Sequence, residues 1–135
     1  MSVKTYHGSC HCGDVKYEAD IDLESGTGRC NCSICHKTRN WGIQIKPEAF
    51  RLLTSPDKLT DYSFGSMQGH GMFCKRCGVR TYLHGDVPEI GGKFVSIQIA
   101  SLDDVSDEQL AALPISYANG RDNDWFHAPK VTSYM

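Results

Sequence analysis

Hydrophobic and polar residues alternate along most regular segments of the chain, which is the pattern of half-buried β-strands. The clearest segment, residues 94–100, places Val95, Ile97 and Ile99 on one face, with polar residues between them. Further strands are expected at residues 14–19, 41–45, 49–53, 59–64, 71–73 and 79–83.

Only one segment has the signals of a helix. Ser106 and Gln109 are spaced as a capping box, residues 110–113 continue the helix, and Pro114 ends it. The polar and then aromatic segment 119–126 is expected to be a loop. Many short strands and one short helix predict a single mainly-β domain over residues 1–135, a length that allows one ordinary core.

Composition and charge narrow the possible functions. The net charge is −2, which argues against direct binding of nucleic acid because such proteins usually carry a basic surface. No apolar run approaches the roughly 20 residues of a membrane helix, and the first residues lack the apolar segment of a signal peptide. A cytoplasmic protein without a membrane partner is therefore expected, while the sequence carries no signal for an oligomeric state.

Seven cysteines are unusual for a chain of 135 residues in a reducing compartment. An odd number leaves one thiol outside any full set of disulfides, and cytosolic redox conditions disfavour such a set. Clustered cysteines in a cytosolic protein are instead typical of metal sites or reactive thiols. The clusters are Cys10-His11-Cys12-Gly13, Cys30-Asn31-Cys32-Ser33-Ile34-Cys35 and Cys74-Lys75-Arg76-Cys77-Gly78.

The third cluster is the strongest single signal for a metal. In a Cys-x-x-Cys-Gly turn both sulfurs can converge on one ion, and Gly78 accepts the positive φ that such turns often need. One such pair also occurs in redox proteins. That alternative is weaker here because no βαβ pattern surrounds the pair and two more clusters accompany it.

Seven thiolates divide into four plus three. The second cluster supplies three close together, and the other two clusters supply two each. A site of four cysteines is closed and structural, whereas three ligands leave one position open, as in catalytic zinc sites. The sequence therefore predicts two zinc ions: one held by Cys10, Cys12, Cys74 and Cys77, and one held by Cys30, Cys32 and Cys35.

An open site of three thiolates favours a thiol as its fourth ligand. The zinc centre then carries negative charge, so it is poor at generating hydroxide from water, whereas it lowers the pKa of a bound thiol and holds it as a thiolate. We expect such a site to release its metal more readily than a closed one. A histidine is an alternative fourth ligand, and His11 and His36 are adjacent to candidate cysteines. A third interpretation has one zinc only, with the surplus cysteines packed in the core.

Four other side chains near the clusters have open roles. Lys75, Arg76 and Arg80 form a basic group beside the third cluster; the simpler interpretation is compensation of thiolate charge, and the alternative is an anion site. Trp41 follows the second cluster, where it either lines a pocket or packs as a half-buried strand residue.

At these residues the chain resembles the family of glutathione-dependent formaldehyde-activating enzymes, which includes centromere protein V. The similarity extends from about Tyr6 to Trp125, and the second cluster and the tail are closer to the centromere-protein branch. All seven cysteines fit the family. The matching segments are residues 8–13, 30–35, 50–53, 73–79, 101–104 and 119–122.

The resemblance implies a β-tent fold of small antiparallel sheets around zinc. It assigns Cys10, Cys12, Cys74 and Cys77 to a structural zinc. It assigns Cys30, Cys32 and Cys35 to a catalytic zinc. It also implies a carbon–sulfur lyase that condenses formaldehyde with glutathione to S-(hydroxymethyl)glutathione. The centromere branch suggests the alternative, a zinc-stabilised module that binds a protein and catalyses nothing.

Overall fold

The architecture is mainly β, as the alternating pattern predicted. The computed structural model describes residues 2–135, and Met1 lies outside the described residues. The strands are β1 (Lys4–Ser9), β2 (Lys16–Ile21), β3 (Thr27–Cys30), β4 (Trp41–Ile45), β5 (Phe50–Leu52), β6 (Leu59–Tyr62), β7 (Gly69–Cys74), β8 (Arg80–Val87), β9 (Gly92–Gln98) and β10 (Ile115–Ala118).

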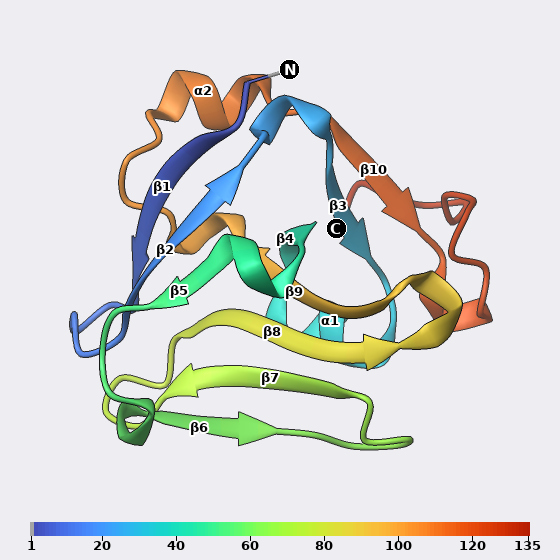
Figure 1. The fold of residues 1–135 in the computed structure, drawn as a ribbon. Coiled ribbons are helices and arrows are strands. Elements are labelled where there is room, and N and C mark those ends of the chain that lie inside the picture. Colours follow the sequence, from blue (N-terminus) through green and yellow to red (C-terminus); the bar gives the residue numbers. More distant parts are fainter. Residues whose placement is uncertain (1) are drawn as a thin grey trace.

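The strands form two sheets (Figure 1). The smaller sheet has the order β1-β2-β5 and is antiparallel. The larger sheet has the order β10-β3-β4-β9-β8-β7-β6. Its pairs are antiparallel except β10 with β3, which run parallel, so the expectation of antiparallel sheets fails at this one edge.

Aromatic side chains join the two sheets. Tyr17 of β2 is fully buried, and its ring centroid lies 5.4 Å from that of Phe50 on β5 and 6.3 Å from that of Tyr82 on β8. Ile43 and Ile97 extend this core across the larger sheet, where they pair directly. Burial of these large apolar groups is the main stabilising contribution to the fold.

Two α-helices are present among the described residues, α1 (Ser33–Thr38) and α2 (Asp107–Ala112). The helix predicted near residue 107 is confirmed, including the capping box between Ser106 and Gln109. The prediction of a single helix was wrong, because α1 begins inside the second cysteine cluster. Neither helix is long or apolar enough to span a membrane.

All seven sequence-predicted strands agree with the structure to within four residues at either end, and β4 has the predicted ends. The seventh, 94–100, corresponds to β9 but ends at Gln98, where a 3-10 turn takes over. Three strands were missed: β1, β3 and β10. The parallel pairing of β3 with β10 matters most, because it brings the end of the chain beside the second cysteine cluster.

Candidate metal centres

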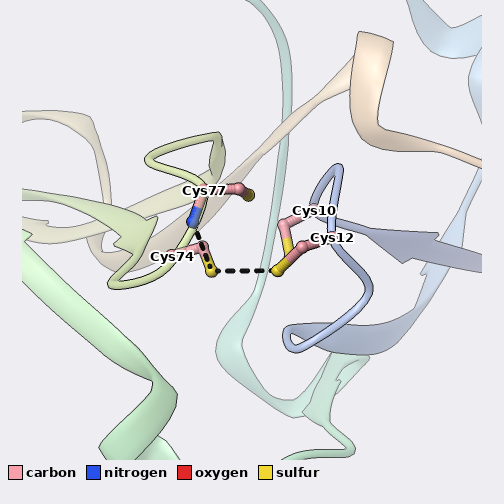
Figure 2. A group of neighbouring side chains, drawn as sticks. All are labelled: Cys10, Cys12, Cys74 and Cys77. Atoms are coloured by element: carbon pink, nitrogen blue, oxygen red, sulfur yellow. Dashed lines mark hydrogen bonds between the residues drawn. The ribbon is translucent and has the colours of Figure 1, made fainter.

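Two hairpin turns that are far apart in sequence bring the first and third cysteine clusters together. Cys10 and Cys12 lie in the loop between β1 and β2, while Cys74 is the last residue of β7 and Cys77 lies in the turn that follows it. Figure 2 shows the two turns facing each other, with the four sulfurs directed toward a common centre. We call these four residues the quartet. The four sulfur atoms all lie within 4.8 Å of one another.

The sulfur–sulfur distances in the quartet fit a tetrahedral zinc site. The Sγ atoms of Cys10 and Cys12 are 3.7 Å apart, and those of Cys12 and Cys74 are 3.6 Å apart. Zinc bound by four thiolates at its usual distance separates the sulfurs by about 3.8 Å. A disulfide would need about 2 Å, and all seven cysteines are free. The donor set and its spacing therefore suit zinc.

Backbone amides of the Cys-x-x-Cys-Gly turn stabilise the thiolate forms of its cysteines. The N–H groups of Arg76 and Cys77 donate to Cys74 Sγ at 3.3 and 3.4 Å. These bonds, led by that from Cys77, lower the pKa of Cys74, and the backbone N–H of Val79 lowers that of Cys77 to about 6. Gly78 has a φ of 77°, the positive value expected for this turn.

The second cluster folds into a single compact turn at the end of β3. Cys30 is the last residue of β3, Cys32 is the N-cap of α1, and Cys35 lies in its first turn. We call these three residues the trio. Their sulfurs also lie within 4.8 Å of one another, and each residue is half-buried. The trio thus has the composition and spacing to hold a zinc ion with three protein ligands.

The sulfurs of the trio are close enough to perturb one another's protonation. The neighbouring thiols of Cys30 and Cys35 lower the pKa of Cys32, whereas Cys30 and Cys32 raise the pKa of Cys35. One thiolate is thus stabilised while its neighbours keep their protons. A cation bound among the three would remove this conflict by favouring all three thiolates.

No histidine completes either group. Among residues 2–135, the only sets of three or more potential ligands within 4.8 Å are the quartet and the trio. Neither His11 nor His36 joins them, although both are adjacent to these cysteines in sequence. The role of the seven cysteines as ligands stays a prediction. The geometry nevertheless separates a set of four from a set of three.

Asn31 connects the trio to the C-terminal loop, and sequence reasoning gave it no role. It is buried, and its side chain donates to Asn119 Oδ1 and accepts from the backbone N–H of Arg121, both at 3.0 Å. Gly120 lies between Cys30 and Trp125, since a Cβ atom there would lie 2.6 Å from Cys30 Sγ and 2.6 Å from the Trp125 ring. The family-like segment 119–122 is therefore part of the trio's surroundings.

The last residues of the chain cover another side of the trio. Arg39 donates to the carbonyl of Tyr134 at 2.7 Å, and the rings of His36 and Tyr134 meet edge to face. Cys30 and Cys35 line a cavity of about 10 Å³ beneath these groups, roughly the space of one water molecule. The end of the chain is therefore part of the trio's surroundings.

The structure divides the basic group that the sequence placed beside the third cluster. Lys75 and Arg76 are exposed in the quartet's turn, and Arg76 makes only a 3.9 Å contact with Asp14. Arg80 is half-buried, and its burial lowers the pKa of the guanidinium, with the thiolates of Cys35 and Cys32 acting in the opposite direction. Trp41 packs as a strand residue, with its indole N–H donating to Thr27 Oγ1 at 2.8 Å.

A larger groove is lined by residues of both sheets and lies apart from the two cysteine groups. Its volume is about 680 Å³, which is within the usual range for small-molecule pockets. Phe50, Tyr82 and Phe94 contribute aromatic surface, and His70 and His84 stack with ring centroids 4.9 Å apart. No cysteine lines this groove.

Comparison with known proteins supports the resemblance seen in the sequence. The family model described as glutathione-dependent formaldehyde-activating enzyme matches residues 5–117. The crystal structure of a Rhodobacter sphaeroides protein, a structural genomics target, is similar with a TM-score of 0.69 and 25% sequence identity. The similarity covers 82% of this chain and 99% of that protein.

Proposed function

Because the chain belongs to the family of glutathione-dependent formaldehyde-activating enzymes, we propose that it is a zinc-dependent carbon–sulfur lyase acting on a thiol adduct of formaldehyde. The observation that carries the proposal is the trio itself. Three thiols converge on one point, and among the described residues no fourth protein ligand completes the set. The remaining position is suited to a thiol from solution.

In the proposed reaction the sulfur of the thiol adds to the carbon of formaldehyde. A carbon–sulfur bond forms, the carbonyl π bond breaks, and the thiol proton ends on the new hydroxyl oxygen, which gives a hydroxymethyl thioether; the lyase direction reverses these changes. With glutathione the product is S-(hydroxymethyl)glutathione. When bound, zinc would supply the stabilisation that keeps the thiol as a thiolate at neutral pH.

The residues of the chain have separate roles in this proposal. Cys30, Cys32 and Cys35 hold the ion, and the short helix α1 fixes the last two relative to each other. The Asn31 side chain and Gly120 hold the C-terminal loop against Cys30. The quartet lies in other turns of the chain, where a second zinc would join the two sheets and contribute to folding.

Exchange between formaldehyde and glutathione, measured by NMR, tests the proposal. We expect the protein to accelerate exchange, and we expect glutathione to change the charge-transfer spectrum of a cobalt-substituted sample. No acceleration with glutathione or any common thiol would sink the lyase proposal. Native mass spectrometry gives an independent check, with two zinc ions per chain expected.

A zinc-stabilised protein-binding module is the second candidate. The observation that favours it is an exposed aromatic pair on the edge strand β6 and just beyond it. Tyr62 and Phe64 stack with ring centroids 5.7 Å apart and are 53% and 47% exposed. The variant Cys32→Ser separates the candidates, since a module would keep its function after losing the trio's metal, and an enzyme would not.

A further inference from the structure

Strand β4 separates the large groove from the trio. At one end of β4, Trp41 pairs with Arg29, the residue before Cys30. At the other end, Ile45 pairs with Val95, which lines the groove. The four residue steps between these two pairs span roughly 13 Å at the usual rise of a strand. The groove is therefore a feature separate from the trio, and its lining contains no cysteine.

The groove changes character along strand β8. Tyr82, His84 and Asp86 line it at alternate positions, so their side chains lie on one face of the strand. The Tyr82 ring packs against Phe50 of β5 with ring centroids 4.5 Å apart, which makes this end aromatic. Asp86 is exposed at the other end, where it pairs in register with Lys93 of β9, another lining residue. The groove is thus aromatic at one end and charged at the other.

The two charged residues of the groove lie side by side without bonding each other. Residues directly opposite in an antiparallel pair, as Asp86 and Lys93 are, have Cβ atoms about 5 Å apart. Among residues 2–135, neither side chain makes an ion pair within 4.0 Å or a hydrogen bond. A Cβ atom at Gly92 would lie 3.8 Å from Asp86 Oδ1, which places this carboxylate beside the start of β9. A carboxylate and an ammonium group are thus both available to a ligand.

His84 adds a polar group without charge to the middle of the groove. Its ring stacks on that of His70 with centroids 4.9 Å apart, and Asp61 Oδ2 lies 3.2 Å from His70 Nδ1. Burial, followed by the neighbouring His70, lowers the pKa of His84, so its ring is neutral at pH 7. Within the described part of the chain, the ring nitrogens of His84 make no hydrogen bond. They can therefore bond a polar atom of a ligand.

We propose that this groove binds a small molecule with one aromatic ring and a zwitterionic head, which is the chemistry of an aromatic α-amino acid. The ring packs against Tyr82 and Phe50. The ammonium group binds Asp86, and the carboxylate binds Lys93. A volume of about 680 Å³ is ample for such a molecule. Opposite charges on one ligand complement both protein groups, whereas a ligand with a single charge would be repelled by one of them. Binding here is independent of the trio's metal and goes beyond the proposed function.

Three ligands test the proposal by NMR titration of the zinc-loaded wild type. L-Phenylalanine carries both charges, 2-phenylethylamine lacks the carboxylate, and 3-phenylpropionate lacks the ammonium group. We expect L-phenylalanine to bind with a Kd of about 1 mM or below, and to shift the signals of Tyr82 and His84. Each analogue should bind about fivefold more weakly, which is the effect of one exposed ion pair. No binding of L-phenylalanine, or equal affinity for all three ligands, would overturn the proposal.

Two variants assign the charges. Asp86→Asn should weaken the binding of L-phenylalanine and 2-phenylethylamine about fivefold, and it should not weaken that of 3-phenylpropionate. Lys93→Gln should weaken L-phenylalanine and 3-phenylpropionate, and it should not weaken 2-phenylethylamine. Both side chains are exposed, so we expect both variants to fold. Unchanged affinities in both variants, or the opposite selectivity, would contradict the assignment.

Asp57→Asn and Lys58→Gln are the matched controls, because these adjacent exposed residues carry the same two charges and do not line the groove. Both should keep the wild-type affinities; equal losses in these controls would show a general effect of charge and overturn the proposal. Failure here and failure of the lyase proposal are distinguishable. Binding of L-phenylalanine without formaldehyde–glutathione exchange would support the groove and defeat the lyase proposal, and exchange without this binding would do the reverse.

Discussion

The quartet and the trio place the same side chain in different surroundings. The quartet joins two turns that are more than 60 residues apart, and Cys10 and Cys74 in it are almost fully buried, with 4% and 1% exposure. The trio lies within one short stretch, and all three of its residues are half-buried. Burial and long chain separation suit a structural site, whereas local, accessible thiols suit a site that exchanges ligands.

The largest expected difference is in stability. Cys74→Ser removes a quartet ligand that also accepts two backbone hydrogen bonds, so we expect zinc loss and a decrease of at least ~3 kcal/mol in the free energy of unfolding. Cys32→Ser should lower it by less than about 1 kcal/mol, because the trio joins no distant segments. Chemical denaturation followed by circular dichroism measures both. Equal losses would break the distinction between the two sites.

The same pair of variants separates the sites by activity. Cys32→Ser should reduce the rate of formaldehyde–glutathione exchange by more than about 100-fold. This loss exceeds the one seen when a residue that only supports a metal ligand is replaced, because Cys32 is itself a proposed ligand. It should also retain one zinc ion per chain. Full exchange activity in this variant, measured by NMR, would remove the trio from the reaction.

Removal of zinc from the wild type tests the same difference between the quartet and the trio. We expect a chelator to remove one zinc at least about tenfold faster than the other, because three ligands hold an ion less firmly than four. Time-resolved native mass spectrometry should show a long-lived form with one ion. A single common rate of release for both ions would contradict the assignment of an open and a closed site.

A smaller effect is expected at the contact between the trio and the C-terminal loop. Gly120→Ala should cost about 1–3 kcal/mol, because the new methyl group would collide with Cys30 Sγ and the Trp125 ring. It should also lower the trio's zinc affinity while the quartet keeps its ion. Gly28→Ala is the control, since a Cβ atom there would meet only the carbonyl of Ser116 at 3.8 Å. Equal stability and zinc content in both variants would show that the contact is unimportant.

The smallest expected effect concerns Asn31. Asn31→Ala leaves the N–H of Arg121 and the Oδ1 of Asn119 without their partner, at a cost of about 1–2 kcal/mol. Denaturation should show this loss, and hydrogen exchange should rise in residues 119–122 before it rises near the quartet. Asn40→Ala serves for comparison, because among the described residues the Asn40 side chain makes no hydrogen bond. Identical exchange in both variants would argue against the connection.

Much of the strand pattern was readable because one face of each strand is buried. In β2, Tyr17, Ala19 and Ile21 are buried at alternate positions, which is the period that a sheet imposes. The missed elements lack that signal. Helix α1 has six residues and no buried side chain, and β3 contains Gly28 and Arg29 among its four residues. Such segments take their conformation from neighbours and turns, not from a periodic apolar face.

The sequence by itself determined how the cysteines are grouped locally, because seven cysteines in three tight clusters fix which thiols are near neighbours along the chain. Only the tertiary structure decided what surrounds them. Parallel pairing of β3 and β10 brings Gly120 against Cys30, and the packing of the two sheets brings the turns that carry Cys10 and Cys77 together. Both depend on contacts between strands distant in sequence, which no local pattern encodes.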